Sequence, residues 1–346
     1  MKFRTLFTVL AAGVTVASCT SEPLADPASQ LQAARSGPAF AASAEPEEEP
    51  VLSPFLADLD ARLAASGSNL RVLRAEFMVD TGAAEFGSQV LIANNRVRGL
   101  AYEWVSGDPR RGGRVGVNYA FDPYQGREPF TRNPDGSGLR QMPFAELEPQ
   151  LEQAMSAWRD RTCSDAPIDR VALPAGVDPD LLDNLFLGSD GGRGTPVTLS
   201  DIVQAGWQLP SFFTAFAGPS GNNIIGVTFS FYFVDGSGNP TDINGDGRLD
   251  TGLAELYYNT RFAWGNSGAP NVVDTWHITT HETGHAVSLA HFGKVFVTKR
   301  DAANGISITD IKYAPRALMN AVYVTGRTPI TGTDNSSFCQ VWASKN

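Results

Sequence analysis

The sequence predicts an α+β domain built on a mixed, twisted sheet. Short segments with strand-like apolar patterns occupy the middle of the chain. A helix pattern interrupts them at 144–161, where Leu147, Leu151, Met155 and Trp158 form one apolar stripe. A second helix pattern follows them at 272–289 and carries three of the four histidines of the chain, with the fourth, His291, just after it. This order of strand, helix, strands and helix is typical of α+β or α/β-type mixed sheets.

The remaining elements follow from the spacing of apolar residues. A helix is expected at 54–65, and strand-like patterns run through 70–104. Further strands are expected at 115–121, 168–173, 197–207, 224–234 and 253–259, and a last helix at 331–344. The segment 224–234 is nearly continuous in aromatic and β-branched residues, so it is expected to be a central or well-covered strand.

The N-terminus has the features of an export signal. A basic start is followed by an apolar run of about a dozen residues, which is too short to span a bilayer. We therefore expect a signal peptide at 1–18, and its end resembles a bacterial lipoprotein box with Cys19 as the lipidated residue. An ordinary signal with a chance cysteine is the alternative. The following stretch, 19–52, is rich in Ala, Pro, Ser and Glu and is expected to be a flexible tether.

The turn-rich segment 107–113 suggests a domain boundary. It divides the mature chain into an N-terminal segment, 53–113, and a larger domain, 114–346. The N-terminal segment is expected to be a propeptide or a small β-rich module. Arg110 and Arg111 offer a candidate processing point between the two parts.

Two cysteines remain once Cys19 is assigned to the signal, namely Cys163 and Cys339. An exported chain with two thiols usually pairs them, so a disulfide is predicted, with two separate buried thiols as the alternative. The formal net charge of −10 makes a nucleic-acid partner unfavourable.

The histidines point to a metal. His281 and His285 are four residues apart and so lie on one helix face, and His291 follows six residues later. Two imidazoles on one face suit a tetrahedral zinc ion, and Glu282 lies beside them, where it can hold and deprotonate water. His277 is one turn earlier on the same edge and is interpreted as a packing residue, since three imidazoles in a row cannot surround a tetrahedral ion.

The sequence resembles the metzincin peptidases, and within them the matrixins, at these histidines and at Met319. The segment 317–323, Ala-Leu-Met-Asn-Ala-Val-Tyr, looks like the family's methionine turn, which lies beneath the zinc ligands. The resemblance covers about 114–346. It implies a long active-site helix, zinc on His281, His285 and His291, and Glu282 as general base. Where the family has glycine this chain has Ser288, which must allow the chain to reverse towards His291.

A calcium loop is predicted at 242–250. Oxygen-bearing side chains occupy positions 1, 3, 5 and 9 of an EF-hand-type loop, with glycine at position 6. The predicted ligands are Asp242, Asn244, Asp246, Asp250 and the backbone carbonyl of Arg248. Position 12 is a leucine, so the usual bidentate glutamate is missing unless another group supplies it. An acidic surface turn is the alternative.

Taken with the resemblance, these residues predict an exported zinc metalloendopeptidase that acts on protein or peptide substrates. The substrate is expected to lie extended beside an edge strand of the sheet. Contact with a membrane is expected only through a lipid on Cys19, and a monomer is expected. Two other functions remain open: a surface-anchored, metal-stabilised binding or adhesion module without catalysis, and a zinc hydrolase that acts on something other than peptides.

Overall fold

The computed structural model describes residues 50–81, 89–97, 101–122, 126–174, 176–177, 179–182, 185, 199–265, 272–301, 307–324 and 326–343. All described residues belong to one compact unit, Pro46–Asn346. The predicted signal peptide, the predicted lipidation site at Cys19 and most of the predicted tether therefore lie outside the described residues.

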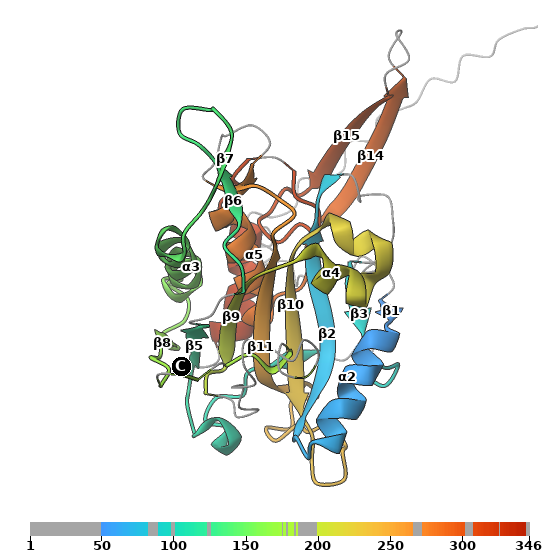
Figure 1. The fold of residues 1–346 in the computed structure, drawn as a ribbon. Helices are drawn as coiled ribbons and strands as arrows, with labels where there is room; N and C mark the ends of the chain where they lie inside the picture. The colour runs from blue at the N-terminus through green and yellow to red at the C-terminus, as the bar shows by residue number, and fades with distance from the viewer. Residues whose placement is uncertain are drawn as a thin grey trace, which may run out of the picture. The chain divides into compact units, whose positions relative to one another are not determined.

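A mixed sheet forms the centre of the fold (Figure 1). Among the described residues it contains nine strands. Across the sheet these are β1 (Val51–Leu52), β3 (Val90–Ile92), β2 (Leu70–Val79), β10 (Ile224–Phe233), β11 (Leu249–Asn259), β9 (Ile202–Gln208), β5 (Val117–Phe121) and β8 (Ile168–Arg170), with β4 (Tyr102–Glu103) paired to β11. Strands β11, β9, β5 and β8 run parallel to one another, whereas β10 is antiparallel to both β11 and β2. The predicted mixed sheet is confirmed, and the arrangement is compatible with the predicted α+β class.

Helices cover both faces of the sheet because the strand residues alternate between two apolar cores. On one face, Leu256 and Tyr258 of β11 pack in a core with residues of α3 (Phe144–Arg159), α5 (Thr275–Ala286) and α6 (Gly332–Trp342). On the other face, Leu253 and Tyr257 pack in a core with residues of α2 (Pro54–Ala65) and α4 (Pro210–Ala217). The helix that carries the histidines, α5, is thus buried against the sheet.

The N-terminal segment contributes strands to this sheet, although the sequence suggests a boundary near residue 113. Strand β2 pairs along its length with β10, and α2 packs against β2 in the same core as α4. The dibasic pair is also structural. Arg110 is paired with Asp108 and Asp250, and the side chain of Arg111 is buried against Asp201 at 3.1 Å. Both arginine side chains are therefore held in ion pairs, and processing at this pair remains a prediction.

Most predicted elements are found close to their expected bounds. The expectation that 224–234 is a covered strand is confirmed, since β10 lies between β2 and β11. Two elements were not expected: α4, and the hairpin of β14 (Lys294–Asp301) and β15 (Ser307–Ala314), which follows α5. Smaller pairs are β6 (Phe130–Arg132) with β7 (Leu139–Gln141), and β12 (Trp264–Gly265) with β13 (Val273–Asp274). None of the described helices has the length and apolar character that crossing a membrane requires.

Candidate metal centre

Helix α5 sets the first two histidines. Its N-terminus is capped by Asp274, whose carboxylate accepts the N–H of His277 at 2.8 Å. His281 and His285 lie one turn apart on the buried face of the helix, and both side chains are inaccessible to solvent. The spacing that the sequence shows is therefore realised as one imidazole pair facing the interior.

The chain reverses directly after this helix and brings in the third imidazole. Ser288 has a φ of 70°, the left-handed region, and is the only non-glycine residue with positive φ among those described. The N–H of Leu289 donates to the carbonyl of Gly284 at 2.9 Å across this bend. The predicted reversal at Ser288 is confirmed, and it places His291 against the other two rings.

The three Nε2 atoms converge on one point. The Nε2 atom of His285 is 3.1 Å from that of His281 and 3.2 Å from that of His291. Nitrogens bound to a tetrahedral zinc at about 2.0–2.1 Å would be about 3.3 Å apart, so the cage has the right size. Among the described residues this is the only group of three or more His, Cys, Asp or Glu side chains whose donor atoms lie within 4.8 Å of one another.

Backbone carbonyls orient the rings. The Nδ1 atom of His281 lies 2.8 Å from the carbonyl oxygen of Leu318, and that of His285 lies 2.7 Å from the carbonyl of Leu289. If each Nδ1 carries the proton, each Nε2 presents its lone pair to the metal position. Burial lowers the pKa of His281 to about 4 and lowers the pKa values of His285 and His291 well below the usual range. Neutral imidazoles are the form that binds a metal.

The predicted methionine turn lies under the helix. An added Cβ on Gly284 would be 2.4 Å from the Sδ atom of Met319, so only glycine lets the turn approach this closely. The carboxylate of Asp334 in α6 accepts the N–H groups of Leu318 and Met319 at 3.0 and 3.1 Å. Met319 therefore forms a fixed apolar support directly beside the helix turn between the two histidines.

Glu282 faces the sheet beside the cage. Its Oε2 atom accepts the hydroxyl of Thr228 at 2.8 Å, and its Oε1 atom accepts the backbone N–H of Met78 at 3.4 Å. Gly226 makes room for it, since a Cβ there would be 2.9 Å from the Cγ of Glu282. Burial raises the pKa of Glu282 well above its usual range, against the two hydrogen bonds. The side chain can thus hold a proton as well as accept one.

His277 is a packing residue, as the sequence indicated. Its ring lies edge-on to Tyr323 with centroids 5.1 Å apart, and its Nδ1 accepts the N–H of Thr328 at 3.1 Å. Burial lowers the pKa of His277 to about 3. It is not a member of the converging group of donor atoms.

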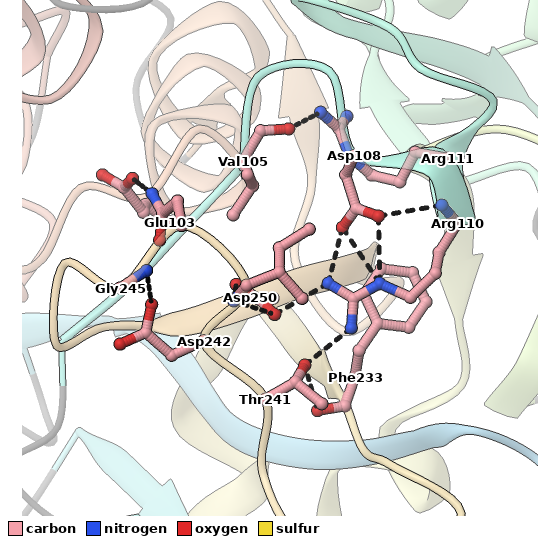
Figure 2. A network of polar contacts seen from close by, with 12 residues as sticks. Glu103, Val105, Asp108, Arg110, Arg111, Phe233, Thr241, Asp242, Gly245 and Asp250 are labelled. Carbon is pink, nitrogen blue, oxygen red and sulfur yellow. Dashed lines mark hydrogen bonds and ion pairs between the residues drawn. The ribbon is translucent and has the colours of Figure 1, made fainter.

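The predicted calcium loop is only partly arranged as expected (Figure 2). The carboxylate of Asp242 accepts the N–H groups of Gly245 and Gly247, as the first residue of such a loop can. Asp250, however, is turned towards Arg110, whose guanidinium donates to it at 2.7 Å. Arg110 comes from a distant part of the sequence, so the motif could not show this contact.

The neighbourhood of the loop also contains a glutamate that the motif lacks. Asn244 donates to the Oε1 of Glu103 at 3.3 Å and to the Oδ2 of Asp246 at 3.0 Å. Arg248 pairs with the other oxygen of Glu103 at 2.6 Å. The five predicted ligands do not share one point in this arrangement, because Asp250 is held by Arg110 and the described carboxylates do not converge. Calcium binding remains a prediction.

The predicted disulfide is confirmed, since Cys163 and Cys339 are bonded. It ties α6 to the segment after α3, and α6 carries the Asp334 that holds the methionine turn. Three residues around Glu282 were not predicted, namely Glu76, Met78 and Thr228. They lie on strands whose local sequence shows only a buried pattern, so no motif marks them.

The chain matches none of the known protein-family models, and a search of curated proteins found no relative.

Proposed function

We propose that the chain is a zinc-dependent endopeptidase of the metzincin type, similar to matrixins. The observation that carries this proposal is the three-histidine cage with a buried glutamate beside it. Among the described residues no fourth His, Cys, Asp or Glu joins the cage. Three protein ligands with an open position are typical of catalytic zinc, whereas structural zinc usually has four. The supporting turn at Met319 is consistent with the same family.

The reaction would be the addition of water across a peptide bond. A zinc ion on His281, His285 and His291 would supply Lewis acidity, which lowers the pKa of water and polarises the scissile carbonyl. Glu282 takes a proton from the attacking water, whose oxygen bonds to the carbonyl carbon, and passes that proton to the amine nitrogen as the C–N bond breaks.

Thr228 has a positioning role in this scheme. Its hydroxyl donates to Oε2 of Glu282 at 2.8 Å and lies 2.9 Å from the backbone oxygen of the same residue. This contact fixes one oxygen of the carboxylate. The other, Oε1, accepts the N–H of Met78 and would exchange the proton once that contact is released. Together with Gly226, the contact with Thr228 explains why the glutamate is held between the helix and β10.

A metal-stabilised binding module without catalysis is the second candidate. The observation that favours it is the burial of the cage: His281 and His285 have no exposed surface, and β2 packs against the helix that carries them. Such a module has no need of a base, so it does not explain the placement of Glu282. Export and a lipid anchor on Cys19 belong to both proposals.

Two substitutions separate these functions. Glu282→Ala should keep one zinc per chain and abolish peptide hydrolysis, since it removes only the base. His285→Ala should lose both zinc and hydrolysis. Zinc is measured by elemental analysis and hydrolysis by digestion of a peptide library. Peptide cleavage that persists in Glu282→Ala would refute the role of the glutamate. If the wild-type protein binds one zinc per chain but cleaves no peptide, even when its metal centre is accessible, the binding module would be favoured.

A further inference from the structure

Strand β2 lies between two segments that flank the metal centre, namely β10 and the segment that follows the methionine turn. On one side it pairs antiparallel with β10, with Phe77 opposite Val227 and Met78 opposite Gly226. On the other side it meets the segment that follows the methionine turn. The N–H of Val79 donates to the carbonyl of Ala321 at 3.1 Å, and the N–H of Tyr323 donates to the carbonyl of Val79 at 2.8 Å.

The same strand also touches the reacting groups. The N–H of Met78 donates to Oε1 of Glu282, and the carboxylate of Glu76 lies 3.3 Å from Nδ1 of His285. The side chain of Met78 is fully buried in the core that contains Met319. Residues 76–79 therefore run in extended form past the metal centre, and their backbone is hydrogen-bonded to the segment that follows the methionine turn.

The expected substrate position beside an edge strand is not met at Glu282, because β10, the strand next to this glutamate, lies inside the sheet. An extended peptide adds to a sheet only where a strand has an unpaired edge. Between Gly226 and Tyr232, β10 is paired with β11 on one side and with β2 on the other (Figure 1). The position that an extended substrate would need beside Glu282 is occupied by the chain itself.

We propose that β2 is an internal occupant of the substrate groove, so that the protein folds in a self-blocked form and acts on other peptides only when β2 leaves the groove. This proposal rests on the proposed peptidase function. An external peptide can bind only to the fraction of molecules in which β2 is displaced, and its apparent affinity falls by that fraction. A test of the proposal should weaken the contacts at Val79, because its backbone hydrogen bonds hold β2 to the segment that follows the methionine turn.

Two zinc-chelating probes, which are not hydrolysed, measure this directly on the full-length, zinc-loaded wild-type protein. Acetohydroxamate requires only the metal, whereas a peptidyl hydroxamate also requires the groove. With β2 in place, the peptidyl hydroxamate should bind no more than about twofold more tightly than acetohydroxamate. Val79→Pro removes the N–H that donates to the carbonyl of Ala321. In this variant the peptidyl hydroxamate should bind at least about tenfold more tightly than acetohydroxamate.

Val72→Pro is the matched control. It places the same residue type on the same strand, but the N–H it removes bonds the carboxylate of Asp60 on α2 at 2.6 Å, away from the groove. This variant should behave as its parent does. A gain in peptidyl affinity of the same size in both variants would overturn the proposal, since it would come from general loosening of the sheet.

Hydrogen exchange of the peptide that spans 70–79 gives a test that needs no proline. Saturating the parent protein with peptidyl hydroxamate should raise exchange in this strand. Tight binding with the strand still protected would overturn the self-blocked form and leave the peptidase intact. Absence of zinc from the three histidines in every sample would instead end the proposed function, and the self-blocked form with it.

Discussion

Ser288 is the position at which the chain accepts backbone strain to close the cage, and Ser288→Gly measures that strain. A side chain in the left-handed region costs about 1–2 kcal/mol, and the φ of Ser288 is 70°. The Oγ atom is also buried and has no hydrogen-bond partner among the described residues. Both features destabilise the native state, and glycine removes both.

The expected gain in the free energy of unfolding is modest, because two stabilising contributions are partly offset by a destabilising one. Relief of backbone strain contributes about 1–2 kcal/mol, and loss of the buried hydroxyl adds about 1 kcal/mol or more. The greater freedom of glycine in the unfolded chain subtracts about 0.5–1 kcal/mol. Ser288→Gly should therefore raise the free energy of unfolding by about 1–3 kcal/mol without weakening zinc binding.

Ser288→Ala is the control that separates the two contributions. It removes the hydroxyl but keeps a side chain in the left-handed conformation, so it should be less stable than Ser288→Gly by about 1 kcal/mol. Urea denaturation of the zinc-free proteins gives both differences. Equal stability of the glycine and alanine variants would show that the bend at residue 288 is not strained, and the explanation of how His291 is delivered would be wrong.

Three further predictions concern stability. Replacing both Cys163 and Cys339 with alanine should lower the free energy of unfolding by about 4–5 kcal/mol on the chain-entropy account, given a separation of 176 residues, and denaturation of the oxidised and variant proteins checks it. Burial raises the pKa of Asp60 from 3.8 to about 6, so the folded state binds more protons than the unfolded state between these values and loses stability as pH rises through them. Asp60→Asn keeps an acceptor for the N–H of Val72. Its free energy of unfolding should exceed that of the wild type by about 1–3 kcal/mol at pH 7 and by nothing at pH 3.5. An equal increase at both pH values would contradict this. If the 242–250 loop binds calcium, a concentration 100 times Kd should stabilise the protein by about 2.7 kcal/mol, and Asp242→Ala should remove the effect; unchanged stability together with no bound calcium would remove the prediction.

The local patterns were sufficient to predict the elements that carry the metal centre. The four-residue step between His281 and His285 determines a shared helix face wherever a helix forms, and it does form there. The need for a reversal before His291 followed from the six-residue spacing, and Ser288 supplies it. Each of these inferences depends on neighbours in sequence, which is why they could be made from one chain.

The pairing of β2 with β10 could not be predicted in the same way. Both segments read as buried strands, but nothing in either pattern says which strand lies beside which. The turn at 107–113 was therefore interpreted as a boundary, although β2 lies inside the sheet of the larger domain. The contacts of Glu282 with Met78 and Thr228 depend on this pairing and were missed for the same reason.

The 242–250 loop illustrates the limit of a motif. The order of oxygen-bearing residues matches a calcium loop, and Asp242 folds back on the backbone as such a loop requires. What the motif cannot contain is a cation from elsewhere in the chain. Arg110 is 140 residues from Asp250 and takes its carboxylate. Arg110, one residue of the dibasic pair, is thus part of the packing around the loop.

The most direct test of the account is the coordination of zinc in the purified protein. A zinc-edge anomalous map of the crystallised protein should place one ion within about 2.0–2.1 Å of Nε2 of His281, His285 and His291, with no fourth protein ligand. Glu282 should lie beside the ion without binding it. An ion held by four protein atoms, or a ring of His291 turned away from the metal, would contradict the central claim that this is a catalytic centre.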